Sequence, residues 1–238
     1  MSQSPYAPPS ADLGSGLPTE MIGARGDLAI GTAFSEAWAA TWRNFPLWLG
    51  TAIVYVLAFA ASVVTGVGIL FALPVLGWGL VRFGLNMYDG GARLADLFSG
   101  FSRYGRALTA MLGYMAGITV VSLAGQSVQI LGQFIENDPV YFVGTVLYAI
   151  VSLLVLPRLT FAALLIVDQD MGGFDALRRS WEATRPCKWQ VIGLYVVSVL
   201  VVIAGMLVLI VGMIPAMVVS GMMWVSGYRQ LFGRPAAG

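Results

Sequence analysis

Histidine is absent from this 238-residue sequence, and there is a single cysteine, Cys187. Histidine is the side chain that most often acts as general acid, general base or metal ligand near neutral pH. One cysteine excludes an intrachain disulfide and leaves the redox compartment undetermined. We therefore expect no catalytic residue, no metal site and no cofactor, and we predict that the protein is not an enzyme.

Charge is also scarce. Charged residues make up 11% of the sequence and hydrophobic residues 58%, whereas an ordinary soluble domain carries about 25% charged residues. The bilayer must then serve as solvent for the apolar surface, so membrane phospholipids are the expected partners. The net charge of +1 argues against nucleic acid, which usually requires a strongly basic surface. The sequence identifies no protein partner and no oligomeric state.

Charged residues are missing altogether from long stretches, of which 44–81 and 189–228 are the longest. A helix of about 20 residues crosses the hydrocarbon core, so each of these stretches predicts two spans joined by a tight turn. Six spans are expected in total, at 47–65, 69–88, 107–132, 141–167, 189–209 and 211–228. They form a membrane domain over 30–232, between a disordered Pro/Ser/Gly-rich tail at 1–29 and a short tail at 233–238.

The spans group into three repeat-like units at 30–88, 93–168 and 173–230. Each unit begins with aromatic and leucine residues at helical spacing beside arginines, which predicts an amphipathic helix in the headgroup plane. The second span of each unit contains a proline (Pro74, Pro157 and Pro215). The predicted fold is therefore an all-α integral membrane protein with six transmembrane helices in three hairpins, each hairpin preceded by an interfacial helix.

Basic residues determine the predicted orientation. All but two of the 13 Lys and Arg residues lie at the inner ends of the hairpins, the exceptions being Arg82 and Arg158. Positively charged connections remain in the cytoplasm, so both termini are expected there. We predict a multi-pass protein of the bacterial cytoplasmic (inner) membrane.

Three short segments resemble a known bacterial family. They are FDALRRSW at 174–181 followed by Trp189, DLFSGF at 96–101, and the closing Tyr228-Arg229. They are similar to the membrane domain of membrane-anchored glycerophosphoryl diester phosphodiesterases and related uncharacterised multi-pass proteins, over about residues 30–232. The resemblance implies a six-span fold with no established biochemical role. The catalytic domain is absent from the chain, and histidine is missing, so that activity does not carry over.

Arg158 follows Pro157 inside the fourth predicted span, about 15 Å from its inner end at the usual helical rise. An arginine at that depth costs several kcal/mol unless it is paired or reaches water. One interpretation is that Arg158 lines a cytoplasm-facing polar cavity and contacts a lipid phosphate or another anion. The other is that the spanning part lies nearer Asp138 and Arg158 extends to the interface. The remaining candidate anion ligands are Arg103, Arg106, Arg178, Arg179, Arg185 and Lys188.

Gln126, Gln129 and Gln133 form a polar stripe at helical spacing on the third predicted span. Such a stripe is able to line a solute path. It is equally able to hydrogen-bond to Tyr148 or Ser152 on the neighbouring helix, and we favour this packing interpretation.

The coincidence of arginines with Trp and Phe faces favours a non-catalytic protein that binds or organises anionic phospholipid at the cytoplasmic leaflet. Each basic group near an anionic surface adds about 1 kcal/mol of attraction. A small-solute or lipid transporter is the first alternative, because repeats and proline-interrupted helices are common there. A membrane scaffold or assembly factor that acts through the Pro-rich tail is the second.

Overall fold

The computed structural model of the protein describes residues 28–64, 68–207 and 209–233. The predicted tails at 1–29 and 233–238 therefore lie almost entirely outside the described residues. Within these ranges the regular structure is helical, as predicted from the sequence. The elements are α1 Ile30–Arg43, α2 Phe45–Val64, α3 Gly68–Asp89, η2 Leu94–Phe98, η3 Phe101–Arg103, α4 Tyr104–Phe134, α5 Asp138–Asp168, α6 Gly173–Ala183, α7 Lys188–Leu207 and α8 Leu209–Phe232.

The six predicted spans correspond to α2, α3, α4, α5, α7 and α8, with ends that agree within a few residues. Four segments of the described chain are long and apolar enough to cross a membrane: Phe45–Val64, Leu94–Leu123, Asp138–Asp168 and Lys188–Leu207. Length and composition thus support a multi-pass membrane protein.

Two of the three predicted amphipathic helices are present as α1 and α6, which precede α2 and α7. The prediction differs from the structure in the second unit. There the chain forms two short 3-10 turns, η2 and η3, before α4 begins. The physical reason is Gly100, which separates the turns: a Cβ atom at this position would lie 2.7 Å from the backbone of Val75. The chain therefore bends closely over α3 at this point.

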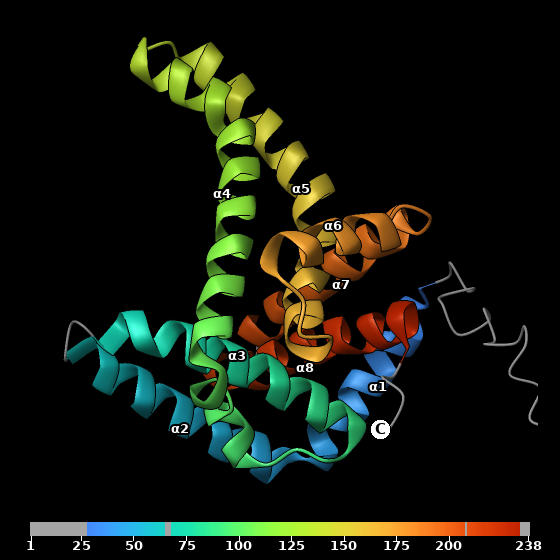
Figure 1. Cartoon of the computed structure of the whole chain (residues 1–238). Coiled ribbons are helices and arrows are strands. Elements are labelled where there is room, and N and C mark those ends of the chain that lie inside the picture. The colour runs from blue at the N-terminus through green and yellow to red at the C-terminus, as the bar shows by residue number, and fades with distance from the viewer. Residues whose placement is uncertain (1–27, 65–67, 208, 234–238) are drawn as a thin grey trace, which may run out of the picture.

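Consecutive helices pack in pairs, α2 with α3, α4 with α5, and α7 with α8. Figure 1 shows that the α4–α5 pair projects away from the other helices, while α2 and α3 extend in another direction. The three pairs therefore do not form one parallel bundle. Their inner ends meet in an apolar core that includes the fully buried Phe161, Met223 and Tyr228.

The amphipathic segments connect the pairs in a ring. η2 packs on α3, α6 packs on α5, and α1 packs on α8, so the first segment closes on the last helix. The closure is partly polar: Glu36 on α1 accepts hydrogen bonds from Ser226 Oγ at 2.6 Å and from Tyr88 Oη at 2.5 Å. The backbone N–H of Ala29 also donates to the Gln230 side chain at 2.8 Å. These contacts hold α1, α3 and α8 together.

Candidate anion-binding site

α6 builds the candidate site, because one face of this helix lies against α4 and α5. Ala176 and Ser180 are fully buried on that face, whereas Arg178 and Arg179 are exposed on the opposite side. A helical spacing of three to four residues produces this division. Phe174, at the start of the helix, is also exposed. α6 therefore presents both an aromatic ring and basic groups on its outer surface.

Arg158 lies between α5 and α6 and is half-buried. Its guanidinium carbon is 3.6 Å from the centroid of the Trp181 ring, a cation–π contact. Its Nε donates to Thr184 Oγ1 at 3.3 Å, and its Nη2 donates to the Trp181 carbonyl at 3.2 Å. The Ser180 hydroxyl in turn donates to the carbonyl of Arg158. α6 thus holds this guanidinium entirely through neutral groups.

The basic candidates divide by their partners. Arg103 and Arg106 both form ion pairs with Asp170, the former at 2.9 Å. Arg178 pairs with Glu182 at 3.0 Å, one helical turn away. Four candidates make no ion pair with a carboxylate within the described part of the chain: Arg158, Arg179, Arg185 and Lys188.

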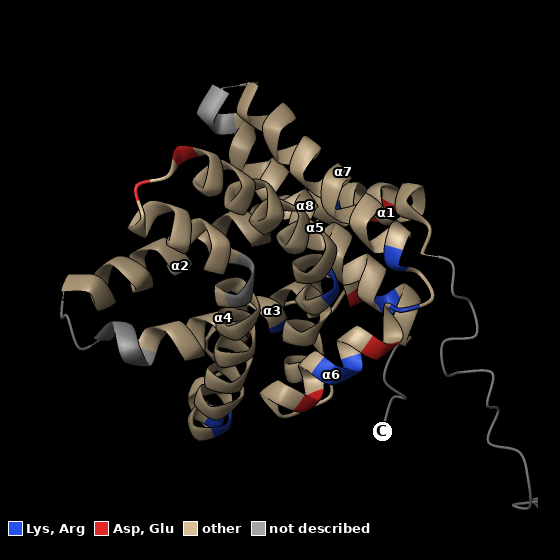
Figure 2. Ribbon diagram, turned by 90° about the horizontal axis from the view of Figure 1, so that it is seen from above, with Lys and Arg blue, Asp and Glu red and all other residues tan. Residues whose placement is uncertain are grey.

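These four groups come from one region of the fold, the junction of α5, α6 and the first residue of α7. Arg179, Arg185 and Lys188 are exposed, and the Lys188 ammonium lies 5.7 Å from the centroid of the exposed Trp189 ring. Figure 2 shows several basic residues, together with acidic ones, along α6 and its outer end, and acidic residues at the connection between α4 and α5. The junction is therefore a positively charged surface with aromatic rings beside it.

The glutamine stripe lies elsewhere, on the projecting part of α4. The Gln129 amide donates to Tyr141 Oη at 3.3 Å, across the α4–α5 interface. The partner is nearer the tip of the hairpin than the predicted Tyr148 or Ser152. Gln126 is half-buried and Gln133 is exposed. A helix-to-helix hydrogen bond is what the packing interpretation predicts for Gln129.

The sequence interpretation missed an ion network at the ends of α3, α5 and α8. Arg229 donates to Asp168 at 2.8 Å and to Asp89 at 2.7 Å, and the Tyr228 hydroxyl also donates to Asp168 at 2.7 Å. The Arg229 side chain is only 6% exposed and that of Asp168 only 9%. Arg229 belongs to the basic residues that the sequence predicts at the inner ends of the hairpins, and in the structure it is a buried cation between two carboxylates. A signal was available: each of these charged residues lies near the end of the second long helix of its unit.

Cys187 provides a chemical test of this junction. Its thiol is buried between α6 and α7, and burial raises its pKa. A raised pKa means less reactive thiolate near neutral pH, and burial limits access for a reagent. We expect Cys187 in the folded protein to react with maleimide about a hundredfold more slowly than a free cysteine. Unfolding in sodium dodecyl sulfate should restore the ordinary rate, and rapid labelling of the folded protein would contradict the described packing.

No protein-family model, no curated protein and no solved structure matches this chain.

Proposed function

We propose that the protein is a non-catalytic, six-span protein of the bacterial inner membrane that binds anionic phospholipid at the cytoplasmic leaflet. In this proposal α2, α3, α4, α5, α7 and α8 cross the bilayer as three hairpins, and both termini lie in the cytoplasm. α1 and α6 then lie at the inner interface.

Internal repetition supports the arrangement of the hairpins. The segment Ala37-Trp38 on α1 corresponds to Ser180-Trp181 on α6, and Ala37 and Ser180 are both fully buried. Thr41 and Thr184 follow at the same spacing and are also fully buried. Each threonine hydroxyl donates to the carbonyl four residues before it, at 2.8 Å in both helices. Two segments far apart in sequence therefore use the same contacts.

The burial of α5 supports the depth assigned to the site. From Asp138 to Leu156 its side chains are largely exposed, whereas most side chains from Pro157 to Val167 are buried in the body of the protein. At about 1.5 Å per residue, the helix covers about 30 Å between Asp138 and Arg158, the thickness of a hydrocarbon core. Arg158 then lies at the boundary with the headgroups. This favours the interpretation in which the span lies nearer Asp138.

The observation that carries the proposal is the group of basic side chains without a carboxylate partner at that boundary. Surface arginines that serve only topology are free to pair with nearby acids, as Arg103, Arg106 and Arg178 do. Arg185 and Lys188 lack such partners among the described residues, and the Lys188 ammonium lies near the exposed Trp189 ring. Aromatic rings favour the acyl boundary, and cations favour lipid phosphates.

The test compares two variants that each remove two positive charges. In phosphatidylcholine nanodiscs or vesicles that contain added phosphatidylglycerol, wild type is expected to retain phosphatidylglycerol preferentially, measured by native mass spectrometry. Arg185→Gln with Lys188→Gln should reduce this preference by about 30-fold, because each of the two groups near the surface contributes about 1 kcal/mol.

Arg103→Gln with Arg106→Gln is the matched control, because both residues are already paired with Asp170. It should retain most of the preference. Equal losses in the two variants would mean that net charge alone decides binding. A wild type without preference for phosphatidylglycerol over phosphatidylcholine would rule out the proposal.

The transporter alternative would gain support from a polar cavity that reaches the middle of the bilayer. The cavity of about 370 Å³ among α2, α3, α5 and α8 is instead lined by apolar residues together with Thr51, whose hydroxyl donates to the Leu47 carbonyl of its own helix. This observation favours lipid binding over solute transport. The scaffold alternative depends on the N-terminal tail, which lies outside the described residues.

A further inference from the structure

We infer that Arg158 and Arg185 form a discrete site for one phosphate group, that of a lipid headgroup, at one of three corresponding joints in the fold. This inference rests on the proposed function and adds a specific ligand geometry to it. A general positive surface would attract anionic lipids without a fixed position. A discrete site requires the shape of the arginine side chains as well as their charge.

The three joints are the places where an amphipathic segment packs on the proline-containing helix of a pair: η2 on α3, α6 on α5 and α1 on α8. The residue after the proline is Val75 on α3, Arg158 on α5 and Ala216 on α8. At the first joint Gly100 lies against the Val75 backbone, and at the second Ser180 donates to the Arg158 carbonyl.

The third joint completes the comparison. There, Trp38 of α1 borders a cavity of about 520 Å³ together with Pro215 and Ala216. At the first and third joints the residue after the proline is therefore small and apolar, whereas at the second joint it is an arginine. Since packing does not require a guanidinium at this position, Arg158 calls for another explanation.

The guanidinium nitrogens of Arg158 leave room for one additional hydrogen-bond acceptor. Nε and Nη2 are held by Thr184 and the Trp181 carbonyl, and the Trp181 ring covers one face of the guanidinium. Within the described chain, Nη1 has no hydrogen-bond partner. The side chain is thus fixed in orientation, with one nitrogen left to donate. A guanidinium that is already fixed in orientation loses little conformational entropy when its remaining nitrogen donates to a phosphate.

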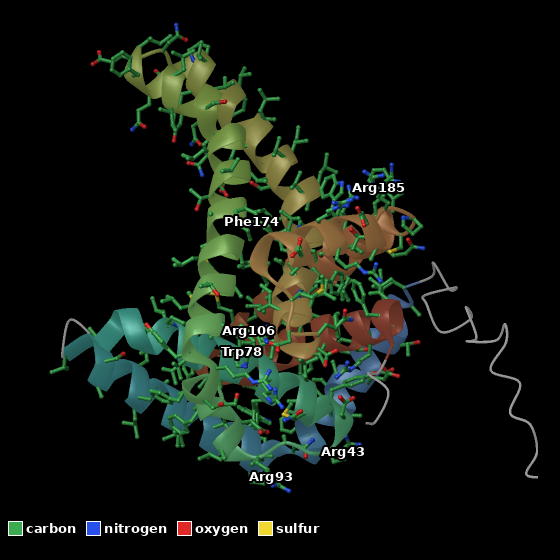
Figure 3. All side chains as sticks on the ribbon, in the orientation of Figure 1. Arg43, Trp78, Arg93, Arg106, Phe174 and Arg185 are labelled. Atoms are coloured by element: carbon green, nitrogen blue, oxygen red, sulfur yellow. The ribbon has the colours of Figure 1, made fainter. Side chains whose placement is uncertain are left out.

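Arg185 supplies the second positive charge. It directly follows Thr184, whose hydroxyl accepts from Arg158 Nε, so both guanidinium groups belong to the C-terminal end of α6. Figure 3 shows Arg185 at the outer end of α6, where α7 begins. Neither guanidinium is paired with a carboxylate in the described residues. Two neighbouring positive charges favour the binding of one anion that contacts both. The abundant anion at this depth is a lipid phosphate.

The experiment replaces arginine by lysine, which keeps the positive charge and removes the planar guanidinium group. The probe is phosphatidic acid in phosphatidylcholine nanodiscs that hold the full-length protein. Arg158→Lys and Arg185→Lys should each weaken retention of phosphatidic acid by about tenfold, because an ammonium lacks the planar array of N–H donors of a guanidinium. At position 158 lysine also stacks less well on Trp181. Arg179→Lys is the matched control on the same helix, and it should leave retention unchanged.

The outcomes separate the two proposals. If wild type prefers phosphatidic acid and all three lysine variants match it, the discrete site is wrong while general leaflet binding stands. A wild type without preference for any anionic lipid refutes both. Competition by inorganic phosphate as strong as that by phosphatidic acid would overturn the assignment to a lipid. Because Arg185 is exposed, the Arg185→Lys variant should fold. It therefore tests the discrete site even if the Arg158→Lys variant fails to fold.

Discussion

Replacing Arg229 with glutamine is expected to lower the free energy of unfolding by about 3–5 kcal/mol. The substitution removes the guanidinium that donates to the Asp168 carboxylate, whose side chain is only 9% exposed. Removing one partner of a buried ion pair costs far more than the pair itself contributes, because the remaining charge stays desolvated. The measurement is the thermal or denaturant unfolding midpoint of the purified protein in detergent micelles.

Two further variants make the Arg229 result specific. Arg178→Gln removes an exposed ion pair with Glu182 and should change stability by less than about 1 kcal/mol. Arg229→Gln combined with Asp168→Asn removes one of the two negative charges and should recover part of the loss. If Arg229→Gln and Arg178→Gln have the same small effect, the three helix ends are not held together by this network.

Replacing Gly79 with alanine is expected to destabilise the protein by about 3 kcal/mol or to prevent folding. Its Cβ atom would lie 1.8 Å from the carbonyl oxygen of Leu97, a backbone atom that cannot move aside as a flexible side chain does. α3 would have to separate from η2, where Leu97 is fully buried. Folded yield and the unfolding midpoint in detergent report the effect.

Gly77, one half-turn earlier on α3, is the matched control. A Cβ atom at Gly77 has no neighbour within 4 Å. Alanine there should be neutral or should stabilise the helix by about 0.5–1 kcal/mol, since glycine is a poor helix former. Similar behaviour of the two alanine variants would show that α3 and η2 are not in close contact.

The local structure was largely predictable from the sequence. Long apolar stretches give the positions of α2, α3, α4, α5, α7 and α8, and amphipathic spacing gives α1 and α6. The 3-10 turns before α4 were not predicted, because they arise from the contact of Gly100 with Val75. That contact joins residues 25 positions apart (100 − 75), and a sequence window cannot detect it.

The candidate site was only partly predictable. Residue type and predicted depth were enough to select Arg158 as unusual. They did not indicate which cations have acidic partners, because the Arg103–Asp170 and Arg229–Asp168 pairs join segments far apart in the chain. For the same reason the stacking of Trp181 on Arg158 was not foreseen. Partner identity depends on tertiary contacts, and these decide which basic groups remain available for a ligand.

The packing of α1 on α8 has a consequence for biosynthesis. α1 leaves the ribosome before α8, so the face of α1 that packs on α8 stays uncovered until α8 has been made. Until then Glu36 lacks the Ser226 hydroxyl that later donates to it. A nascent chain that stalls before α8 therefore displays an unsatisfied helix face, the kind of surface that chaperones and membrane proteases recognise.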